Sequence, residues 1–283
     1  MPGRQELVVS LHRRPPVFSV IGPSAISEAL VWLSKEGETA VLSTFATKSV
    51  IITGGSSGIG RALVERFSKG GASVTFSFFS DETRATELAT RTGARAVRVD
   101  LASPGDIDLI FARAADEFGG VDVVVNNAAV LHHSIPVVDV TPEDYEFVVG
   151  GNLRGSFLVL QNAVRTVRDN GRIISISTLD TANASPGSAL YAAGKAAVER
   201  IVATISKEVG QRGITANSVS PGAVDTARLH MAHGAEELEG AARATPLGRL
   251  THPDDIADVV EFLASPAGGW ITGQNICATG GLG

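Results

Sequence analysis

Cysteine is nearly absent from this sequence. Cys277 is the only one among 283 residues, so no disulfide can form within the chain. No run of about 18 apolar residues occurs, and a membrane-spanning helix requires such a run. The first residues also lack the uninterrupted apolar stretch of a secretory signal. We therefore expect a soluble protein with no membrane partner, located in a reducing cytoplasm.

An excess of basic residues is also missing. The chain has 24 Lys and Arg against 30 Asp and Glu, a net charge of −6, and no stripe or tail concentrates the basic ones. Nucleic-acid phosphates attract a positive field, so this balance argues against a nucleic-acid partner. A chain of this length buries roughly 75% of the surface that its unfolded form exposes. It needs neither a disulfide nor a structural metal to fold.

The first 47 residues differ in composition from the rest. Arg13 and Arg14 precede two prolines, and residues 24–35 have the pattern of a short amphipathic helix. We interpret residues 1–47 as an N-terminal extension, either a weakly packed arm or a docking or organelle-targeting segment. Residues 48–283 read as a single domain.

From Lys48 onward, short runs rich in Val and Ile alternate with longer segments of helical period. Strands are predicted at residues 49–53, 73–78, 96–99, 121–125, 172–177, 215–219 and 270–277. Helical segments are predicted at 59–68, 106–118, 142 to about 169, and 253–264. This alternation predicts an α/β fold: a doubly wound, Rossmann-like parallel sheet of about seven strands with helices on both faces. Ligands of such sheets bind at the carboxyl ends of the strands.

Three glycines, Gly54, Gly58 and Gly60, separate the first predicted strand from the helix that follows. Glycine permits a tight turn, and the free N–H groups at a helix start attract an anion such as a pyrophosphate. The Lys-Ser/Thr pair of a nucleoside-triphosphate loop is missing, since Arg61 follows Gly60. A dinucleotide therefore suits this loop better, although a plain strand-to-helix turn would also use glycine.

Three separated motifs occur along the chain: Thr53-Gly-x-x-x-Gly-x-Gly60, Asn126-Asn-Ala-Ala129 and Tyr191-Ala-Ala-Gly-Lys195. Together they resemble the short-chain dehydrogenase/reductase family, in its short single-domain form similar to 3-oxoacyl-[acyl-carrier-protein] reductases. The likeness covers residues 48–283. It implies an NAD(P)-dependent oxidoreductase that interconverts a ketone and a secondary alcohol. It further implies a small-molecule carbonyl or alcohol substrate and a homo-oligomer, either tetramer or dimer.

Tyr191 and Lys195 are four residues apart in a segment of helical period, so their side chains project from one face. A tyrosine has an ordinary pKa near ~10, and a cationic neighbour lowers it toward the range where the hydroxyl transfers protons. The resemblance implies that Tyr191 is the acid/base and that Lys195 tunes it. The resemblance implies that Asn152 holds a water in the proton path. An amide within a helix can also be a polar residue that repairs a local kink of that helix. Thr178, or Ser177 if the register shifts by one, is implied to hydrogen-bond the substrate carbonyl.

The second predicted strand ends near Phe78 without the Asp or Glu that accepts hydrogen bonds from an adenosine ribose. The small hydroxylated residue Ser80 follows, which favours NADP as the cofactor. NAD stays open, because no Arg adjoins Ser80 and Asp81 is the next residue. Asp100 either contacts the adenine, as the resemblance implies, or caps the next helix. The implied cofactor-binding residues are Gly54, Ser56, Ser57, Gly58, Ile59, Gly60, Ser80, Asp100, Leu101, Asn127, Ala128, Tyr191, Lys195, Pro221, Gly222, Val224 and Thr226.

No metal site is predicted. His132-His133 and His230-x-x-His233 lack a carboxylate or Cys set of metal-ligand spacing. Two other functions stay open on this scaffold: a dinucleotide-binding sensor without catalysis, and a dehydratase or isomerase. The presence of an Asn, a hydroxyl, a Tyr and a Lys together favours the reductase.

Overall fold

The computed structural model describes residues 45–130 and 134–283. The predicted helix at 24–35 and the pair His132-His133 lie outside these residues. All described residues belong to one compact unit, Ser43–Gly283. The extent of the N-terminal extension therefore stays a prediction.

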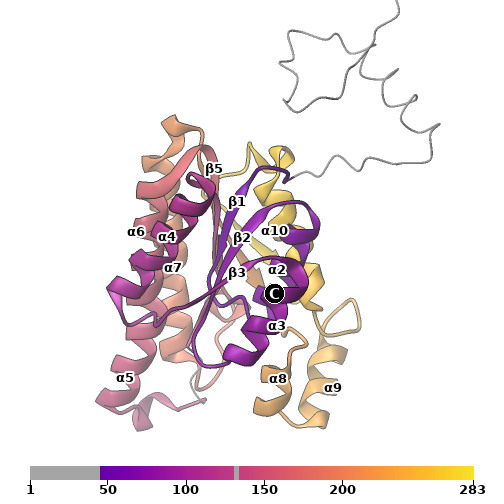
Figure 1. Cartoon of the computed structure of the whole chain (residues 1–283). Coiled ribbons are helices and arrows are strands. Elements are labelled where there is room, and N and C mark those ends of the chain that lie inside the picture. The colour runs from indigo at the N-terminus through magenta and orange to yellow at the C-terminus, as the bar shows by residue number, and fades with distance from the viewer. Residues whose placement is uncertain (1–44, 131–133) are drawn as a thin grey trace, which may run out of the picture. The chain divides into compact units, whose positions relative to one another are not determined.

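The domain is built on one sheet of seven parallel strands in the order β3-β2-β1-β4-β5-β6-β7 (Figure 1). The strands are β1 Ser49–Ile52, β2 Ser73–Phe78, β3 Arg95–Arg98, β4 Val121–Asn126, β5 Val167–Ile176, β6 Thr215–Pro221 and β7 Asn275–Ala278. The predicted Rossmann-like sheet is confirmed.

Helices cover both faces of this sheet (Figure 1). One face carries α2 Gly58–Lys69, α3 Glu82–Thr92 and α10 Pro253–Ala264, and the other carries α4 Pro104–Phe118, α6 Gly155–Thr166 and α7 Ala189–Glu208. Shorter elements are α5 Pro142–Val149, the π-helix η2 Gly150–Arg154, α8 Ala227–Ala232, α9 Ala235–Ala244, and the 3-10 turns η1 Val137–Asp139, η3 Leu179–Thr181, η4 Gly210–Arg212 and η5 Pro266–Gly268. The long predicted helix from 142 is thus two α-helices joined by a π-helical turn.

Strand side chains alternate between two apolar cores, because successive residues of a strand face opposite sides of a sheet. In β1, Val50 and Ile52 pack toward α2 and α10, whereas Ile51 packs toward α4 and α6. Phe45 precedes the predicted domain start at Lys48, yet it is 1% exposed and meets the ring of Phe67 edge-on, with centroids 4.8 Å apart. Both faces of the sheet are filled, which leaves the strand ends for a ligand.

The strand order reverses between β1 and β4. From β1 the chain passes to β2 and then β3 on one side, and it returns to β4 on the other side before continuing to β7. At such a reversal the two connecting loops diverge, and a crevice opens beyond the carboxyl ends of the strands. The glycine loop follows β1 and the Asn126-Asn-Ala-Ala129 motif follows β4, so both border this crevice.

Two predicted strand boundaries are wrong. β5 begins at Val167 rather than residue 172, because Val167 pairs with Val121 and Arg168 forms an ion pair with Asp122 at 3.0 Å, contacts that hydrophobic patterning cannot indicate. The last strand begins at Asn275 rather than Trp270, whose side chain is 98% exposed. Strands are predicted from runs of apolar residues. The polar first half of β5 and the exposed Trp270 before β7 both depart from that pattern.

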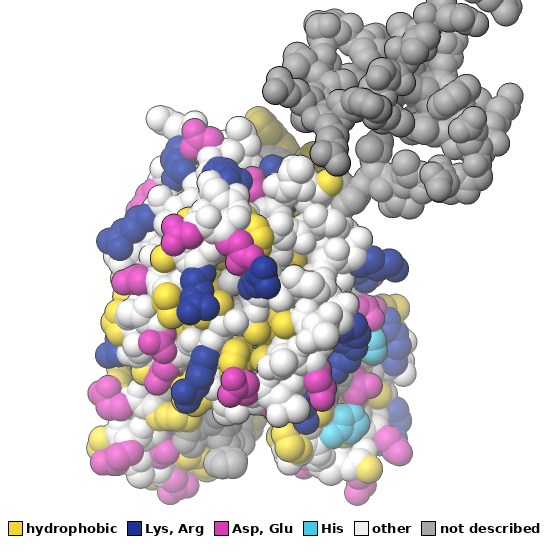
Figure 2. Space-filling model, viewed as in Figure 1, with side chains coloured by type: hydrophobic (Ala, Val, Ile, Leu, Met, Phe, Trp, Pro, Cys, Tyr) yellow, Lys and Arg dark blue, Asp and Glu magenta, His cyan; other side chains and the backbone are white. Residues whose placement is uncertain are grey.

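The surface carries charges of both signs. Basic and acidic side chains are interspersed over the face shown in Figure 2, without a large area of one sign. Among the helices that the structure describes, none combines the length and apolar character that crossing a bilayer requires.

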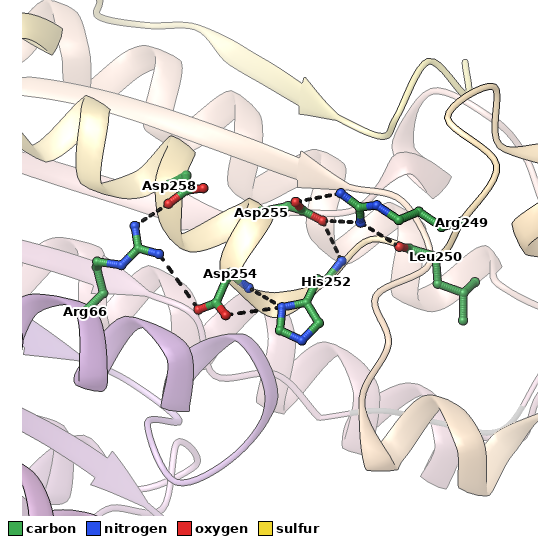
Figure 3. A network of polar contacts seen from close by, with 7 residues as sticks. All are labelled: Arg66, Arg249, Leu250, His252, Asp254, Asp255 and Asp258. Carbon is green, nitrogen blue, oxygen red and sulfur yellow. Dashed lines mark hydrogen bonds and ion pairs between the residues drawn. The ribbon is translucent and has the colours of Figure 1, made fainter.

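A polar network fixes the start of α10 (Figure 3). Arg249 binds both carboxylate oxygens of Asp255, at 2.6 and 2.9 Å, and the backbone N–H of His252 donates to Asp255 Oδ2 at 2.7 Å. On the neighbouring helix α2, Arg66 contacts Asp258 and lies 3.9 Å from Asp254. Asp255 is therefore both a helix cap and the partner of Arg249.

We expect Asp255→Ala to lower the free energy of unfolding by about 1–2 kcal/mol, because it removes a cap and a bidentate ion pair together. Arg249 lowers the pKa of Asp255. The contribution of Asp255 to the free energy of unfolding is therefore complete above the ordinary aspartate pKa. It is lost as the pH falls through the lower pKa of Asp255 in the folded state. Urea unfolding at neutral and acidic pH measures both effects. Asp255→Asn, which keeps an oxygen for the cap, should cost less, and an equal cost would contradict this assignment.

Candidate active site

The glycines after β1 leave no room for side chains. Gly54 and Gly58 have φ angles of +67° and +51°, in the left-handed region that favours glycine. A Cβ on Gly54 would lie 2.9 Å from Ala128 Cα, and one on Gly60 would lie 2.1 Å from the carbonyl oxygen of Gly54. The loop thus approaches both the start of α2 and the loop after β4.

The first turn of α2 offers backbone donors that have no partner among the described residues. Ser57 is the N-cap, and its side chain makes no capping hydrogen bond. The first intrahelical bond runs from Arg61 N–H to Ser57 O at 3.1 Å, so the preceding N–H groups have no partner within the helix. Ser57 is exposed, and Ser56 and Ile59 are half-buried beside it. Hydroxyls and N–H groups are the donors that an anionic pyrophosphate requires.

Thr53 and Asn127 join the glycine loop to the loop after β4. Thr53 Oγ1 accepts hydrogen bonds from the backbone N–H groups of Asn127 and Ala128, at 2.9 and 3.0 Å. Asn127 Nδ2 donates to the carbonyl oxygens of Thr53 and Gly54, at 2.9 and 3.2 Å. These bonds hold the two loops in fixed relative positions before any ligand is present.

The end of β2 lacks a free carboxylate. Ser80 is exposed, and Asp81 caps α3 and pairs with Arg84 at 3.1 Å. Arg98 in β3, which no sequence motif indicated, donates to the carbonyl oxygen of Phe79 at 3.2 Å and lies 6.0 Å from the centre of the Phe79 ring. Parallel pairing places Arg98 opposite Phe78. The pairing of β3 with β2 is therefore the signal that would have placed Arg98 at the end of β2. A cation therefore stands beside Ser80.

Asp100 follows β3 and does not cap α4. The cap is Ser103, which accepts from Asp106 N–H, so the alternative interpretation of Asp100 is wrong. Asp100 Oδ1 accepts instead from Ala102 N–H at 2.9 Å within its own turn, and Asp100 is only half-buried. Leu101 packs on α6, where a Cβ on Gly155 would lie 3.0 Å from its Cβ.

The segment after β6 returns to the glycine loop. Pro221 ends β6, and Gly222 N–H lies 3.4 Å from the carbonyl oxygen of Ala278. Val224 forms an isolated bridge with Thr251. Thr226 caps α8, and its Cγ2 would lie 3.2 Å from a Cβ on Gly58. Thr226, far from Gly58 in the sequence, is thus its neighbour in the fold.

Asn152 lies within the π-helical turn η2 and is 1% exposed. Its amide bonds the backbone of Val130 twice: Nδ2 donates to the carbonyl at 2.7 Å, and Oδ1 accepts from the N–H at 2.9 Å. The helix is thus irregular at Asn152, but the amide bonds Val130 in the loop after β4 rather than the backbone of its own helix. A Cβ on Gly194 would lie 3.6 Å from Asn152 Cβ, so α7 packs against this turn between Tyr191 and Lys195.

Tyr191 and Lys195 project from the same side of α7. Lys195 Nζ lies 5.9 Å from the centre of the Tyr191 ring and donates to the carbonyl oxygen of Ile176 at 2.7 Å. Ile176 ends β5, two residues before Thr178. Lys195 thus binds the end of β5 next to Thr178, Tyr191 lies beside Lys195, and Asn152 packs against α7 between the two.

Burial controls the two pKa values. It raises the pKa of Tyr191 to about 12, with a smaller increase from Asp180 and a decrease from Arg228. It lowers the pKa of Lys195 to about 8, against an opposing increase from Glu199. The pKa of Tyr191 is therefore raised rather than lowered as expected, because removal of the hydroxyl from water is the largest cause and the cation that opposes it is Arg228, not Lys195. Tyr191 is protonated at neutral pH.

Ser177 and Thr178 have different surroundings. Ser177 is buried, and its hydroxyl donates to Glu199. Thr178 is half-buried, and its Oγ1 accepts a long hydrogen bond, 3.3 Å, from Asp180 N–H. Within the described ranges, the Thr178 hydroxyl donates to no acceptor and keeps its proton for a ligand.

The histidines of His230-x-x-His233 face separate carboxylates. His230 lies 2.6 Å from Asp225, and His233 lies 3.1 Å from Glu237. Among residues 45–130 and 134–283, no three His, Cys, Asp or Glu side chains gather as metal ligands would. His132-His133 lies outside the described residues.

Residues 54–283 match the family described as Enoyl-(Acyl carrier protein) reductase. The hydroxynaphthalene reductase-like protein Arp2 of Metarhizium brunneum is 37% identical over 257 residues, covering 84% of this chain and 96% of that protein. An NADPH-dependent aldehyde reductase-like protein of Arabidopsis thaliana, described as chloroplastic, is 33% identical over 83% of this chain and 94% of its own length.

Solved structures show the same fold. A blue fluorescent protein from a metagenomic library, in complex with NADPH, superposes with a TM-score of 0.79 at 36% identity, covering 84% of this chain and 98% of that one. The 3-ketoacyl-(acyl-carrier-protein) reductase of Brucella melitensis, complexed with NADH, gives 0.77 at 30% identity, over 83% and 98%. The chain belongs to the short-chain dehydrogenase/reductase family of NAD(P)-dependent oxidoreductases.

Proposed function

We propose that this protein is an NADPH-dependent ketoreductase that converts a ketone to a secondary alcohol, with Tyr191 as the proton donor. The observation that carries the proposal is the arrangement at the end of β5. There Lys195, buried and 5.9 Å from the ring of the protonated Tyr191, binds the carbonyl oxygen of Ile176, two residues before Thr178, whose hydroxyl donates to no acceptor among the described residues.

The residues present fit a dinucleotide. The positions Gly54 and Gly60 exclude a Cβ, and the start of α2 offers unpaired N–H groups, as a pyrophosphate requires. Asp100 has a carboxylate oxygen for the adenine amino group, and Ser80 would face the 2′-phosphate. NADPH, when bound, supplies the hydride that reduces the carbonyl carbon.

Tyr191 gives its phenolic proton to the carbonyl oxygen as that oxygen gains negative charge. Thr178 donates a second hydrogen bond to the same oxygen, while Ser177 is engaged with Glu199 and does not compete. Lys195, in its charged form, stabilises the phenolate that is left behind. Asn152 lies in the π-helical turn η2, and π-turns are frequent at functional sites, so we place at this turn the water that returns the proton.

Three observations support NADPH over NADH. No free carboxylate stands at the end of β2, since Asp81 is paired with Arg84. Arg98 lies over Phe79, next to Ser80, and a guanidinium attracts a 2′-phosphate. The metagenomic neighbour holds NADPH, and the Arabidopsis relative is named for NADPH.

We also propose a homo-oligomer. Apolar side chains are exposed on η1 and on α6: Val137 is 71% exposed, Val138 90% and Phe157 44%. Burial of this surface against a second copy would remove it from water. Light scattering coupled to size-exclusion chromatography measures the assembly, and a monomer would contradict this proposal.

Parallel measurement of NADPH and NADH oxidation against varied ketones tests the function. The panel includes a 3-oxoacyl thioester, a bicyclic aromatic ketone, a steroid-like ketone and a sugar. We expect turnover of at least one ketone and faster turnover with NADPH. Binding of NADPH without oxidation of any ketone would favour a sensor, and product formation without net NADPH consumption would favour an isomerase or dehydratase.

A further inference from the structure

A carboxylate lies one helical turn beyond Lys195 on the same side of α7. Glu199 follows Lys195 by four residues, as Lys195 follows Tyr191, so the three side chains form a row along the helix. No role assigned so far uses Glu199. Its four-residue spacing from Lys195 is the one signal of Glu199 in the sequence.

Three hydroxyl groups from three elements converge on one oxygen, Glu199 Oε1. Ser177 Oγ at the end of β5 donates to it, Thr181 Oγ1 in η3 lies 2.8 Å away, and Ser220 Oγ in β6 lies 3.3 Å away. Ser220 Oγ also lies 2.9 Å from Asn275 Oδ1 in β7. Glu199 therefore links α7 to two central strands and to the turn after β5. Hydrogen bonds to a charged acceptor are among the strongest in proteins.

The residues that contact Glu199 lie before and after Thr178 in the sequence. Ser177 precedes it directly, and Thr181 Oγ1 also lies 3.0 Å from the Thr178 carbonyl oxygen. One residue before Ser177, the carbonyl oxygen of Ile176 accepts from Lys195 Nζ at 2.7 Å. The segment that carries the Thr178 hydroxyl is thus bound to α7 by two residues, Lys195 and Glu199, which lie one helical turn apart.

Few charged groups act on Lys195. Glu199 raises its pKa, and among the described residues no other charged group contributes to that shift. Asp180 in η3 and Arg228 in α8 act on Tyr191 instead. Because Lys195 is fully buried, loss of a single nearby negative charge has a large effect on its protonation.

We propose that Glu199 is a positioning residue of the reductase site: it fixes the end of β5 beneath Thr178 and keeps Lys195 in the charged form. The kinetic part rests on the proposed ketoreductase function. The effect on the charge of Lys195 does not, since it can be measured without substrate.

Glu199→Gln separates the charge from the hydrogen bonds, because the amide keeps an oxygen for the hydroxyls. Lysine NMR with ¹³Cε labelling measures the titration of Lys195 directly, and the chain has only five lysines to assign. We expect the pKa of Lys195 to fall by about 1 unit in this variant. The decline of kcat/KM for ketone reduction at alkaline pH should move to lower pH by the same amount. Glu208→Gln, an exposed substitution on the same helix, is the matched control and should change neither.

Glu199→Ala removes both the charge and the acceptor. It should show the same change in Lys195 and, in addition, a loss in kcat of about 10-fold or more at a pH where Lys195 is charged, because Thr178 is displaced. An unshifted Lys195 titration in Glu199→Gln would overturn the electrostatic part, and an unchanged kcat in Glu199→Ala would overturn the positioning part. A shifted NMR titration without activity on any ketone would uphold the role toward Lys195 and refute only the ketoreductase function.

Discussion

Tyr191→Phe is expected to lower kcat for ketone reduction by about 10²–10⁴-fold while NADPH still binds, which is the contribution usual for a general acid. The substitution removes one oxygen atom and leaves the ring that packs 5.9 Å from Lys195 Nζ. Fold and cofactor cleft should therefore persist. Steady-state rates on the best ketone of the panel, with NADPH fluorescence titration in parallel, measure the two effects separately.

The chain provides a matched control, because it has only two tyrosines. Tyr145 is 49% exposed on α5. Tyr145→Phe should keep full activity and leaves Tyr191 as the single phenol. In that variant, ultraviolet titration of tyrosinate reports Tyr191 alone, and we expect a pKa of about 12 without cofactor. Near-normal turnover by Tyr191→Phe would refute the assignment of the proton donor.

The pH dependence of reduction follows from the same pair. Tyr191 keeps its proton throughout the neutral range, as a donor must. Lys195 is charged below a pKa of about 8 and neutral above it. We therefore expect kcat/KM to decline above about pH 8, as Lys195 loses its proton. In Glu199→Gln this decline should begin at lower pH, because the pKa of Lys195 is lower there.

The fold could be predicted because local pattern and tertiary structure agree along most of the chain. Val and Ile runs such as Val50–Ile52 are buried on both faces of the sheet, so their apolar character is continuous and easily recognised. Polar residues held by tertiary contacts do not show this pattern. Arg168 belongs to β5 because Asp122 pairs with it from the neighbouring strand.

The relative placement of candidate groups was predictable where a motif puts them on one element, as with Tyr191 and Lys195 on α7. Asn152 was also recognisable, because an amide inside an apolar helix signals a departure from regular bonding, and the π-turn is that departure. Properties that depend on several elements were not predictable. The pKa of Tyr191 is set by burial, and the hydroxyls around Glu199 come from three segments that only the fold brings together.

Gly60→Ala is expected to weaken NADPH binding by about 100-fold, equivalent to about 2.8 kcal/mol. The new methyl group would lie 2.1 Å from the carbonyl oxygen of Gly54 and 2.7 Å from Asn127 Nδ2. The Asn127 side chain can move, but the carbonyl belongs to a loop that Thr53, Ser77 and Asn127 hold by hydrogen bonds. The loop must therefore shift as a whole, and its N–H groups shift with it.

The same overlap should reduce the free energy of unfolding by about 1–3 kcal/mol, the usual cost of overpacking a filled site. Gly105→Ala is the control, since a Cβ there meets no atom within 4 Å and Gly105 lies in the first turn of α4. This control should keep NADPH affinity and gain up to about 1 kcal/mol from the helix preference of alanine. Fluorescence titration and urea unfolding of both variants give the comparison. If Gly60→Ala bound NADPH as tightly as Gly105→Ala, the glycine loop would not be the pyrophosphate site.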